Sequence, residues 1–381
     1  MKKVLVLGTK NYDFDLYKEF KKKDFLTYFC GNVRSSRIPK HIWIELDYTK
    51  ITSLLNFILE NKDFEFIIPG SNDLAYLSSS RIVKKLGNRL GKIINIDNIK
   101  KAEDYLLKTK FRKKVLPYFV SSPKILNEEN IDKVKYKFVL KKDKLSGGKG
   151  IHFFDNGDFY KAVLPKNNYS KPYVLEEFIE GSGHGASLFL ENGKFKYEFF
   201  DDEYYCKDRL AVVATSSPTS LNNEEKQKLR SFCLHYVTEN NLVDGLFHIQ
   251  CIKRNKEIFI TECTRRLPGD FYHKFSSLST GHSYLKYYVN GFLNFYKNLQ
   301  IVTGNKNNIV RVVCDDLIVK RIHSDEYIHK TILKCLIDRV KLDGFRISSN
   351  GKKYKKKEVM FLKFQDISES TYFCHKLVKD L

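Results

Sequence analysis

The sequence lacks features that mark several large classes of protein. It contains no run of about 18 uncharged apolar residues, which is the length that a membrane-spanning helix needs. The opening stretch MKKVLVLGTKNY becomes polar after a short apolar run, too early for the hydrophobic region of a secretory signal. We therefore expect a cytoplasmic protein without a membrane span.

The cysteines lack the spacing that metal sites need. No CxxC pair occurs, and most of the cysteines stand inside apolar or strand-like segments. Neither a zinc site nor a disulfide framework is indicated. We expect all eight to be structural: Cys30, Cys206, Cys233, Cys251, Cys263, Cys314, Cys335 and Cys374.

Acidic residues are scarce relative to basic ones. The chain has 45 Asp and Glu against 67 Lys and Arg, which gives a formal charge of +22. Such a charge favours anionic partners, among them nucleotides, acidic sugars and nucleic acid. Lysine runs such as those at 21–23 and 355–357 are usually solvated surface. We do not expect nucleic acid as a partner; that alternative predicts an affinity that falls steeply with salt.

The first 97 residues alternate between two hydrophobic patterns. Strand-like runs occur in VLVLG, LTYFCGN, HIWIELD and FEFIIP, and helical stretches follow near 13–23 and from Asp73, with Ser71 or Asn72 as its cap. Strands that alternate with helices indicate a parallel α/β unit. We predict a Rossmann-like N-terminal domain over residues 1–97.

The middle of the chain is rich in strands. A helix is predicted over residues 99–116, with Lys108 on it, and strands follow in YKFVLK, GIHFF and PYVLEEFI. ASLFLENGKFKYEFF is typical of a hairpin that turns at Asn192 and Gly193. A helix over 223–239 precedes two strands, LFHIQCIK and EIFITE, joined at 254–256, and HSYLKYYVNGFLNFY is helical.

Two segments suit nucleotide phosphates and an adenine ring. In VLKKDKLSGGKGI, Lys141 ends a strand and glycines follow, which lets the backbone fold over phosphates. The alternative is an ordinary hairpin tip, because the segment has neither the Walker spacing nor a GxGxxG pattern. About twenty-five residues later, YVLEEFIEG could offer backbone groups to an adenine edge.

One pair of oxygen ligands suits magnesium. Gln250 and Glu262 stand on adjacent predicted strands, where their side chains could converge on one ion. Magnesium needs few protein oxygens when phosphates supply the others. The alternatives are a surface amide at Gln250 and a solvated charge cluster in FITECTRRLPGD.

In their order and spacing, these segments resemble the ATP-grasp superfamily of carboxylate-amine ligases. VLKKDKLSGGKGI resembles its phosphate loop, YVLEEFIEGSGH its hinge, and FHIQCIKRNKEIFITECTRR its metal-bearing strands. The resemblance covers roughly residues 1–300. It implies an α/β fold of the α+β ATP-grasp type. The pre-ATP-grasp domain would be residues 1–97 and the ATP-grasp domain residues 98–300, with a mobile lobe at about 115–180. Residues 301–381 would be a C-terminal extension of unknown role.

The resemblance also implies roles for individual residues. Lys108 and Lys141 would hold the ATP phosphates, and Lys141 and Arg266 would act in catalysis. The loop over the phosphates would be Ser146, Gly147, Gly148 and Gly150; the hinge beside adenine Glu176, Glu177, Phe178 and Ile179; the ribose contact His184; and the metal ligands Gln250, Glu262 and Thr264. Thr264 stands where the family has asparagine, and Lys142 replaces a common proline, so one or two metal ions remain open.

The activity implied is that of an ATP-dependent ligase. A carboxylate would be activated as an acyl phosphate and joined to an amine, with Mg²⁺ or Mn²⁺ present and ADP and phosphate released. Arg265, Arg266, Asp270, Tyr272 and His273 cluster after the metal strands, and two arginines suggest an acidic substrate such as an amino acid or sugar acid. A homodimer is left open, and TRRLPGDFYHKF resembles a subgroup associated with surface polysaccharides.

Two other functions fit the same resemblance. A bicarbonate-using carboxylase or carbamoyl-phosphate-like enzyme is favoured by Gln250 and His184. An ATP-binding regulatory protein with weak catalysis is favoured by Thr264.

Two substitutions test the predicted site. Glu262→Ala should abolish magnesium-dependent ADP formation, because it removes the carboxylate ligand, and Lys141→Ala should weaken ATP binding. ADP release and nucleotide titration measure the two effects. Neither change should unfold the chain, so full activity in either folded variant would remove the assignment.

Overall fold

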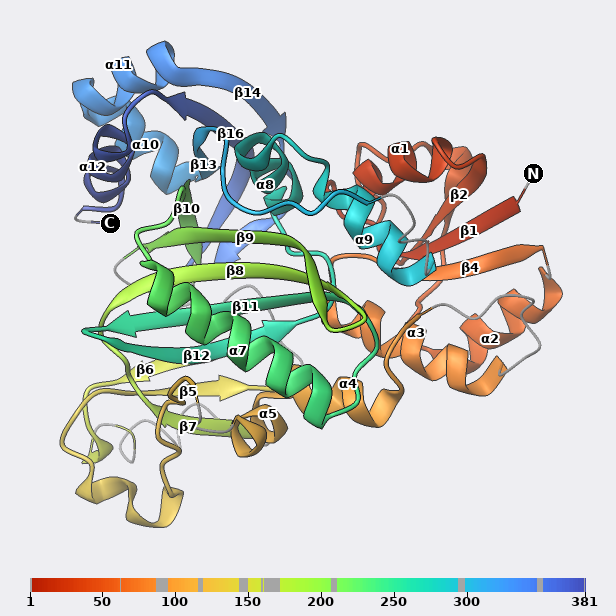
Figure 1. The fold of residues 1–381 in the computed structure, drawn as a ribbon, viewed down its shortest axis with the longest axis horizontal. Coiled ribbons are helices and arrows are strands. Elements are labelled where there is room, and N and C mark those ends of the chain that lie inside the picture. The colour runs from red at the N-terminus through yellow and green to blue at the C-terminus, as the bar shows by residue number, and fades with distance from the viewer. Residues whose placement is uncertain are drawn as a thin grey trace.

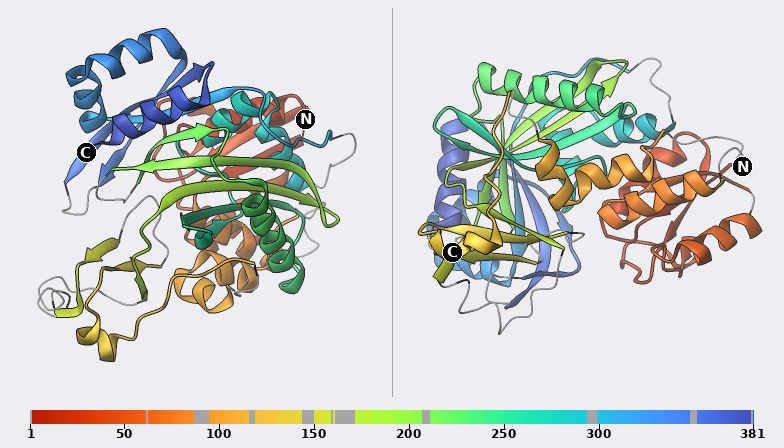
Figure 2. Two further views of the ribbon diagram at one scale, coloured as in Figure 1. Left: turned by 60° about the vertical axis from the view of Figure 1, so that its left-hand side comes forward. Right: turned by 90° about the horizontal axis from the view of Figure 1, so that it is seen from below.

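The computed structural model describes residues 2–61, 63–86, 95–115, 119–143, 150–158, 160, 172–206, 211–293, 299–347, 352–379 and 381. The described elements form three sheets with helices packed against them (Figures 1 and 2). Within these ranges, no helix combines the length and apolar character needed to cross a membrane.

The N-terminal unit is a parallel four-stranded sheet in the order β3-β2-β1-β4. Its strands are β1 (Lys2–Leu7), β2 (Phe25–Cys30), β3 (Trp43–Ile44) and β4 (Phe64–Pro69), and its helices are α1 (Leu16–Lys21), α2 (Ile51–Glu60) and α3 (Asp73–Leu86). Val4 and Val6 join one core and Leu5 and Leu7 another, because successive strand residues face opposite sides. The parallel α/β unit predicted from the alternating pattern is confirmed.

The central sheet has nine strands, eight of them in the order β12-β11-β8-β9-β10-β13-β16-β14, with β15 paired to β16. The bounds are β8 (Ser182–Glu191), β9 (Lys194–Tyr205), β10 (Val212–Ser217), β11 (Gly245–Arg254), β12 (Glu257–Thr264), β13 (Asn308–Asp315), β14 (Leu336–Lys341), β15 (Phe345–Ile347) and β16 (Lys353–Phe364). Helix α7 (Asn223–Glu239) crosses the face of β8, β9 and β11 (Figure 1). The hairpin turn predicted at Asn192 and Gly193 is present, and both residues have positive φ.

The last 81 residues complete the central sheet, which the prediction of a separate extension did not foresee. Strand β13 pairs with β10 and with β16, so the sheet continues without a break past residue 300. Helices α10 (Asp316–Ser324), α11 (Glu326–Cys335) and α12 (Ile367–Val378) cover it and share its core (Figure 1). Helices α8 (Tyr272–Thr280) and α9 (Tyr284–Leu293) connect this sheet to the N-terminal unit.

A third, antiparallel sheet in the order β6-β5-β7 occupies the predicted lobe region. Its strands are β5 (Phe138–Lys142), β6 (Ile151–Phe154) and β7 (Tyr173–Glu177). Phe138, Phe154 and Tyr160 pack in a small core of their own. This sheet lies below the central sheet in Figure 1 and contributes a second wall to the cavity described below.

The helix predicted over 99–116 is two helices. Helix α4 (Ile99–Leu106) ends where Leu107 becomes extended, and α5 (Lys108–Lys114) starts at the next residue. Asp143 accepts hydrogen bonds from the Thr109 backbone nitrogen (3.0 Å) and hydroxyl (2.5 Å), so it caps α5 from 34 residues away. Lys108 is therefore the first residue of a helix, and no residue near it in the sequence indicates that the helix before it ends.

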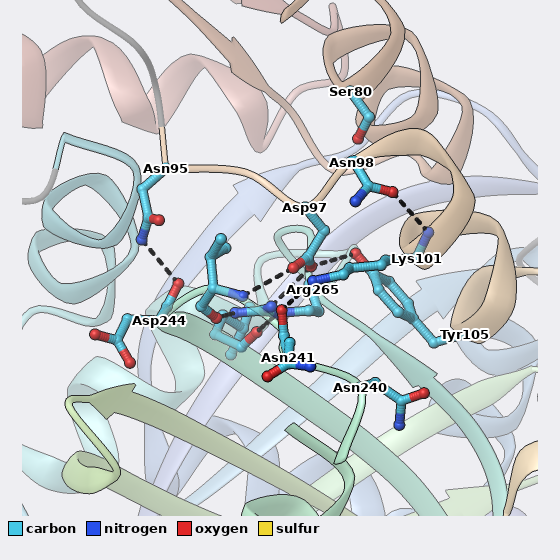
Figure 3. Close-up of polar contacts among 12 residues, drawn as sticks. Ser80, Asn95, Asp97, Asn98, Lys101, Tyr105, Asn240, Asn241, Asp244 and Arg265 are labelled. Atoms are coloured by element: carbon cyan, nitrogen blue, oxygen red, sulfur yellow. Dashed lines mark hydrogen bonds and ion pairs between the residues drawn. The ribbon is translucent and has the colours of Figure 1, made fainter. Parts of the chain in front are cut away.

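A buried ion pair joins the start of α4 to the central sheet (Figure 3). Arg265 donates to Asp97 at 2.7 Å and to the Leu246 carbonyl at 2.8 Å. Asp97 also accepts from the Tyr105 hydroxyl at 2.9 Å and from the Val243 backbone nitrogen at 2.9 Å. The Asp97 and Arg265 side chains are 0% and 3% exposed, so their charges depend on each other.

We expect Arg265→Met to lower the free energy of unfolding by about 3–5 kcal/mol, because Asp97 would remain buried without its cation. Chemical denaturation measures the loss. Arg339→Met, which removes an exposed arginine, is the control and should change little. Adding Asp97→Asn to Arg265→Met should recover part of the loss, and a single variant as stable as the original chain would contradict the prediction.

Candidate active site

A single cavity of about 340 Å³ contains most of the residues singled out from the sequence. The small sheet and the central sheet form two walls, and the N-terminal unit adds Tyr12 and Ser71. Tyr12 follows β1 and Ser71 follows β4, which are neighbours in the sheet. After β1 the sheet continues on one side through β2 and β3, whereas β4 lies on its other side, so the strand order reverses between β1 and β4. Ligands of parallel sheets bind at such a point, beyond the carboxyl ends of the strands.

Gln250 and Glu262 face each other across β11 and β12, and both line the cavity. The register shifts directly after this pair, which leaves Thr261 as an extra residue on β12. The Thr261 hydroxyl donates to the Gln250 backbone carbonyl at 2.9 Å. A bulge of this kind redirects side chains and is common beside active sites.

The orientation of the Gln250 amide is set by Glu203. Gln250 Nε2 donates to the two carboxylate oxygens of Glu203 at 2.8 and 3.0 Å, which leaves Oε1 as the acceptor end. Glycines make this approach feasible: a Cβ on Gly185 would lie 2.6 Å from Asp201, and one on Gly183 would lie 2.4 Å from the Tyr205 ring. The two glycines keep this face of β8 open.

The donor set of Gln250 and Glu262 suits one magnesium ion whose other ligands come from phosphates and water. No group of three or more His, Cys, Asp or Glu side chains in the described part of the chain could hold a metal. Thr264, the third predicted ligand, also lines the cavity, and its hydroxyl is directed at Asp73 (3.4 Å).

Lys141 belongs to a buried charge cluster. It forms an ion pair with Glu176, whose carboxylate also accepts a hydrogen bond from Arg112 Nε at 2.5 Å. Burial would raise the pKa of Glu176, but the charges of Arg112 and Lys141 outweigh it and lower that pKa to about 2. Burial lowers the pKa of Lys141, Glu176 opposes the change, and Arg112 and Lys108 reinforce it. Lys108 lines the same cavity, as predicted for the pair of lysines.

All four predicted hinge residues, Glu176, Glu177, Phe178 and Ile179, line the cavity. The backbone nitrogens of Glu177 and Phe178 donate to carbonyls of Lys124 (3.0 Å) and Lys137 (3.1 Å). The carboxylates of Glu176 and Glu177 are engaged, so among these residues the side chains of Phe178 and Ile179 and the backbone groups other than these two nitrogens remain for a base. Ser146, Gly147 and Gly148 lie outside the described residues, whereas Gly150 accepts a hydrogen bond from the Lys142 nitrogen at 3.0 Å.

His184 is not at the cavity, contrary to its predicted role at a ribose. Its side chain is fully buried, with Nδ1 2.8 Å from Asp202 and Nε2 2.8 Å from the Ser182 hydroxyl. It alternates with Gly183 and Gly185 along β8 and therefore faces the opposite side of the strand. Both ring nitrogens are engaged there.

The two arginines after β12 point in different directions. Arg266 lines the cavity and pairs through Nε with Asp73 at 2.7 Å. Arg265 binds Asp97 behind the sheet, and His273 binds Asp15 at 2.9 Å, so neither contributes to the cavity lining. The prediction of two substrate-facing arginines is thus wrong for Arg265.

Sequence reasoning missed three cations of the C-terminal segment. Arg311 on β13, Arg346 on β15 and Lys356 on β16 all line the cavity. It also missed Arg112 and Asp73, which hold Glu176 and Arg266. The only signal was the positive charge itself, because long-range strand pairing brings these residues together.

Comparison with known proteins identifies the central part of the chain. The family model described as the ATP-grasp domain matches residues 104–270. No curated protein matches the chain.

Solved structures share the fold over almost the whole chain at low identity. Phosphoribosylglycinamide synthetase from Anaerococcus prevotii is 14% identical, with a TM-score of 0.68 and coverage of 100% of this chain and 98% of that one. L-amino acid ligase from Bacillus licheniformis is 12% identical, with a TM-score of 0.74 and coverage of 99% and 97%.

The ADP complex of N5-carboxyaminoimidazole synthetase from Staphylococcus aureus is 11% identical, with a TM-score of 0.74 and coverage of 99% and 97%. The likeness in fold extends through the C-terminal segment, so the predicted limit near residue 300 is too short.

The cavity contains a histidine whose titration should be visible in stability. Burial, and then the charges of Arg266 and Arg311, lower the pKa of His248 from 6.5 to about 3. Because the pKa of His248 is lower in the folded state than in the unfolded state, neutral His248 does not reduce the free energy of unfolding above pH 6.5. As the pH falls from 6.5 towards 3, the unfolded state binds the proton more readily, so the free energy of unfolding decreases.

We therefore expect His248 to account for a loss of about 2 kcal/mol in unfolding free energy between pH 7 and pH 5. Denaturant unfolding at the two pH values should show this loss in the original chain but not in His248→Asn. His41→Asn, at an exposed position, is the control and should keep it. An equal pH dependence in His248→Asn would contradict the prediction.

Proposed function

We propose that this chain, whose residues 104–270 match the model of the ATP-grasp domain, is an ATP-dependent ligase of that superfamily that joins a carboxylate to an amine. The observation that carries the proposal is one cavity that contains Gln250 and Glu262 as an opposed pair, together with Lys108 and Lys141. Oxygen ligands and fixed cations at one place suit a triphosphate with its metal.

The adenine end of the cavity lies between the two sheets. Val139, Ile151 and Phe153 of the small sheet and Ile252 of the central sheet supply apolar surface beside Phe178 and Ile179. Because the backbone nitrogens of Glu177 and Phe178 are already bonded, the edge of the base would meet other backbone groups of residues 177–179. Glu176 acts as the support of Lys141, since its carboxylate is engaged by two cations.

The phosphate end lies at the two lysines. Lys108 and Lys141 bind the phosphates as fixed charges that need no rearrangement during the reaction. Gln250 Oε1 and the Glu262 carboxylate would hold magnesium, which neutralises phosphate charge and orients the transferred group. Ser146, Gly147, Gly148 and Gly150 remain the proposed cover over the phosphates.

The reaction proceeds in two transfers. A carboxylate oxygen of the substrate attacks the γ-phosphorus, the bond from that phosphorus to the β,γ-bridging oxygen breaks, and ADP leaves. The nitrogen of the amine then attacks the acyl carbon, phosphate leaves with the oxygen between carbon and phosphorus, and the nitrogen loses a proton. Arg266, held by Asp73, stabilises the charge on the transferred phosphoryl group.

A regulatory protein that binds ATP with little turnover is the second candidate. The observation that favours it is Thr264, whose hydroxyl is directed at Asp73 and is thus not offered to a second metal ion. A bicarbonate-using enzyme would share the phosphate and metal residues and differ only in the carboxylate.

The decisive experiment is a screen of carboxylates and amines for the release of ADP and phosphate. We expect release to require magnesium and both substrates, and hydroxylamine to trap the acyl phosphate as a hydroxamate when it replaces the amine. Glu262→Gln should lower the rate by at least about a hundredfold, because the amide is a weaker metal ligand.

Glu257→Gln is the matched control for Glu262→Gln, since Glu257 is exposed at the start of the same strand and should not affect the rate. Nucleotide binding without ADP release for any pair would replace the ligase by the regulatory protein. ADP release with bicarbonate, and with none of the other carboxylates, would favour the bicarbonate-using enzyme.

A further inference from the structure

The cavity end opposite the adenine wall is formed by cations that have acidic partners, with one exception. Arg266 pairs with Asp73 (2.7 Å), Lys356 with Asp270 (2.6 Å) and Arg346 with Asp315 (2.5 Å). Arg311 has no carboxylate within ion-pair distance among the residues that the structure describes. It is the cation of this end whose charge is least compensated.

Arg311 is buried in a way that calls for an anion. Its side chain is 5% exposed, and Nη1 donates to the backbone carbonyls of Gly269 and Asp270 at 3.4 and 3.3 Å, both long for hydrogen bonds. Its guanidinium lies over the Tyr272 ring, 5.4 Å from the centroid. Within the described residues, Nε has no hydrogen-bond partner, and such a donor is costly to leave unmatched.

Asp201 is one of the acids that interact electrostatically with Arg311, and its environment disfavours its charged form. Asp201 is fully buried, accepts the Tyr272 hydroxyl, and leaves Oδ2 without a partner among the described residues. Burial, and then the charge of Glu203, raise the pKa of Asp201 well above its usual value, and the charge of Arg311 only partly offsets this. The raised pKa favours the protonated form of Asp201, so this carboxyl group compensates the charge of Arg311 less than an ordinary aspartate would.

Strand register places Arg311 within reach of the reaction centre. Arg311 stands opposite Thr215, and Thr215 stands opposite Glu203, the residue that binds the Gln250 amide. Two strand spacings separate Arg311 from Glu203, or about 10 Å between their backbones. An extended small molecule can span that gap.

We propose that Arg311 binds a second anionic oxyacid group of the substrate, so that the substrate is a carboxylic acid that also carries another carboxylate or a phosphate. This inference rests on the proposed function for the role of the first carboxylate. A planar guanidinium can donate two parallel hydrogen bonds, a geometry that matches two oxygens of a carboxylate or phosphate. Lys356 and Arg346 line the same end and add positive potential.

Equilibrium binding tests the proposal without relying on turnover. Succinate, 3-phosphoglycerate and acetate are titrated calorimetrically into the chain saturated with magnesium and a non-hydrolysable ATP analogue. We expect succinate or 3-phosphoglycerate to bind at least about tenfold more tightly than acetate, because only they can reach Arg311 with a second charge. The tighter of the two identifies the second group as a carboxylate or a phosphate.

The variant Arg311→Met should lower the affinity for the tighter dianion at least about tenfold and leave the affinity for the ATP analogue within about twofold. Arg339→Met removes an equal but exposed charge from the same C-terminal segment and should change neither affinity. If Arg311→Met does not fold, Arg311→Lys decides: it should weaken the dianion at least about threefold, because lysine cannot bind with two parallel hydrogen bonds.

Equal affinities of the three acids, or an affinity that does not depend on Arg311, would overturn the inference. The result is separable from that of the ligase screen. Binding that depends on Arg311 without any ADP release would reject the ligase and keep the anion site, whereas ADP release with acids that ignore Arg311 would do the reverse.

Discussion

The buried ion pair between Arg112 and Glu176 is the interaction on which the cavity depends. Arg112 lies on α5 and Glu176 lies on β7. The Arg112 guanidinium also donates to the carbonyls of Ile260 and Thr261 on β12. One side chain thus fixes the small sheet against the strand that carries Glu262. Removing one partner of such a pair leaves a buried charge exposed to an apolar environment, so this junction has little freedom to shift.

The same junction sets the electrostatics of Lys141. Glu176 is shared between Arg112 and Lys141, so its one negative charge faces two positive ones. The cluster keeps a net positive charge next to Lys108, in a place from which water is largely excluded. Fixed charges in such a place act strongly on a polyanion, because few solvent dipoles oppose them. A cavity of this kind discriminates against neutral ligands before any specific contact forms.

Local patterns in the sequence predicted the elements that neighbours in the chain determine. The pairing of Gln250 with Glu262 followed from a hairpin whose turn residues were recognisable, and the first sheet followed from alternating strands and helices. Alternation along β12 also contained the information that Arg265 and Arg266 diverge, because Glu262, Thr264 and Arg266 share one side. The break before Lys108 had no such signal, since its cap, Asp143, is distant in sequence.

Long-range pairing explains most of what the sequence left open. Nothing near Arg311 predicts that β13 joins β10, and hence nothing predicts that Arg311 shares a cavity with Glu262. His184 shows that a matching position along the chain is not sufficient. Its place in the sequence matched the resemblance, but its side chain lies on the face of β8 that points away from the cavity. Spacing along the chain locates a residue on an element, and strand register decides what it faces.

The contribution of β16 to the cavity has a consequence for protein synthesis. Tyr12 enters the cavity from the loop after β1 and Lys356 from β16, with Glu176, Glu262 and Arg311 between them in sequence. A polypeptide still attached to the ribosome lacks part of this wall until β16 has emerged. The nascent chain therefore cannot assemble the complete pocket, or gain stability from its ligands, until β16 has been made, and the domains that precede it must remain folded by their own cores until then.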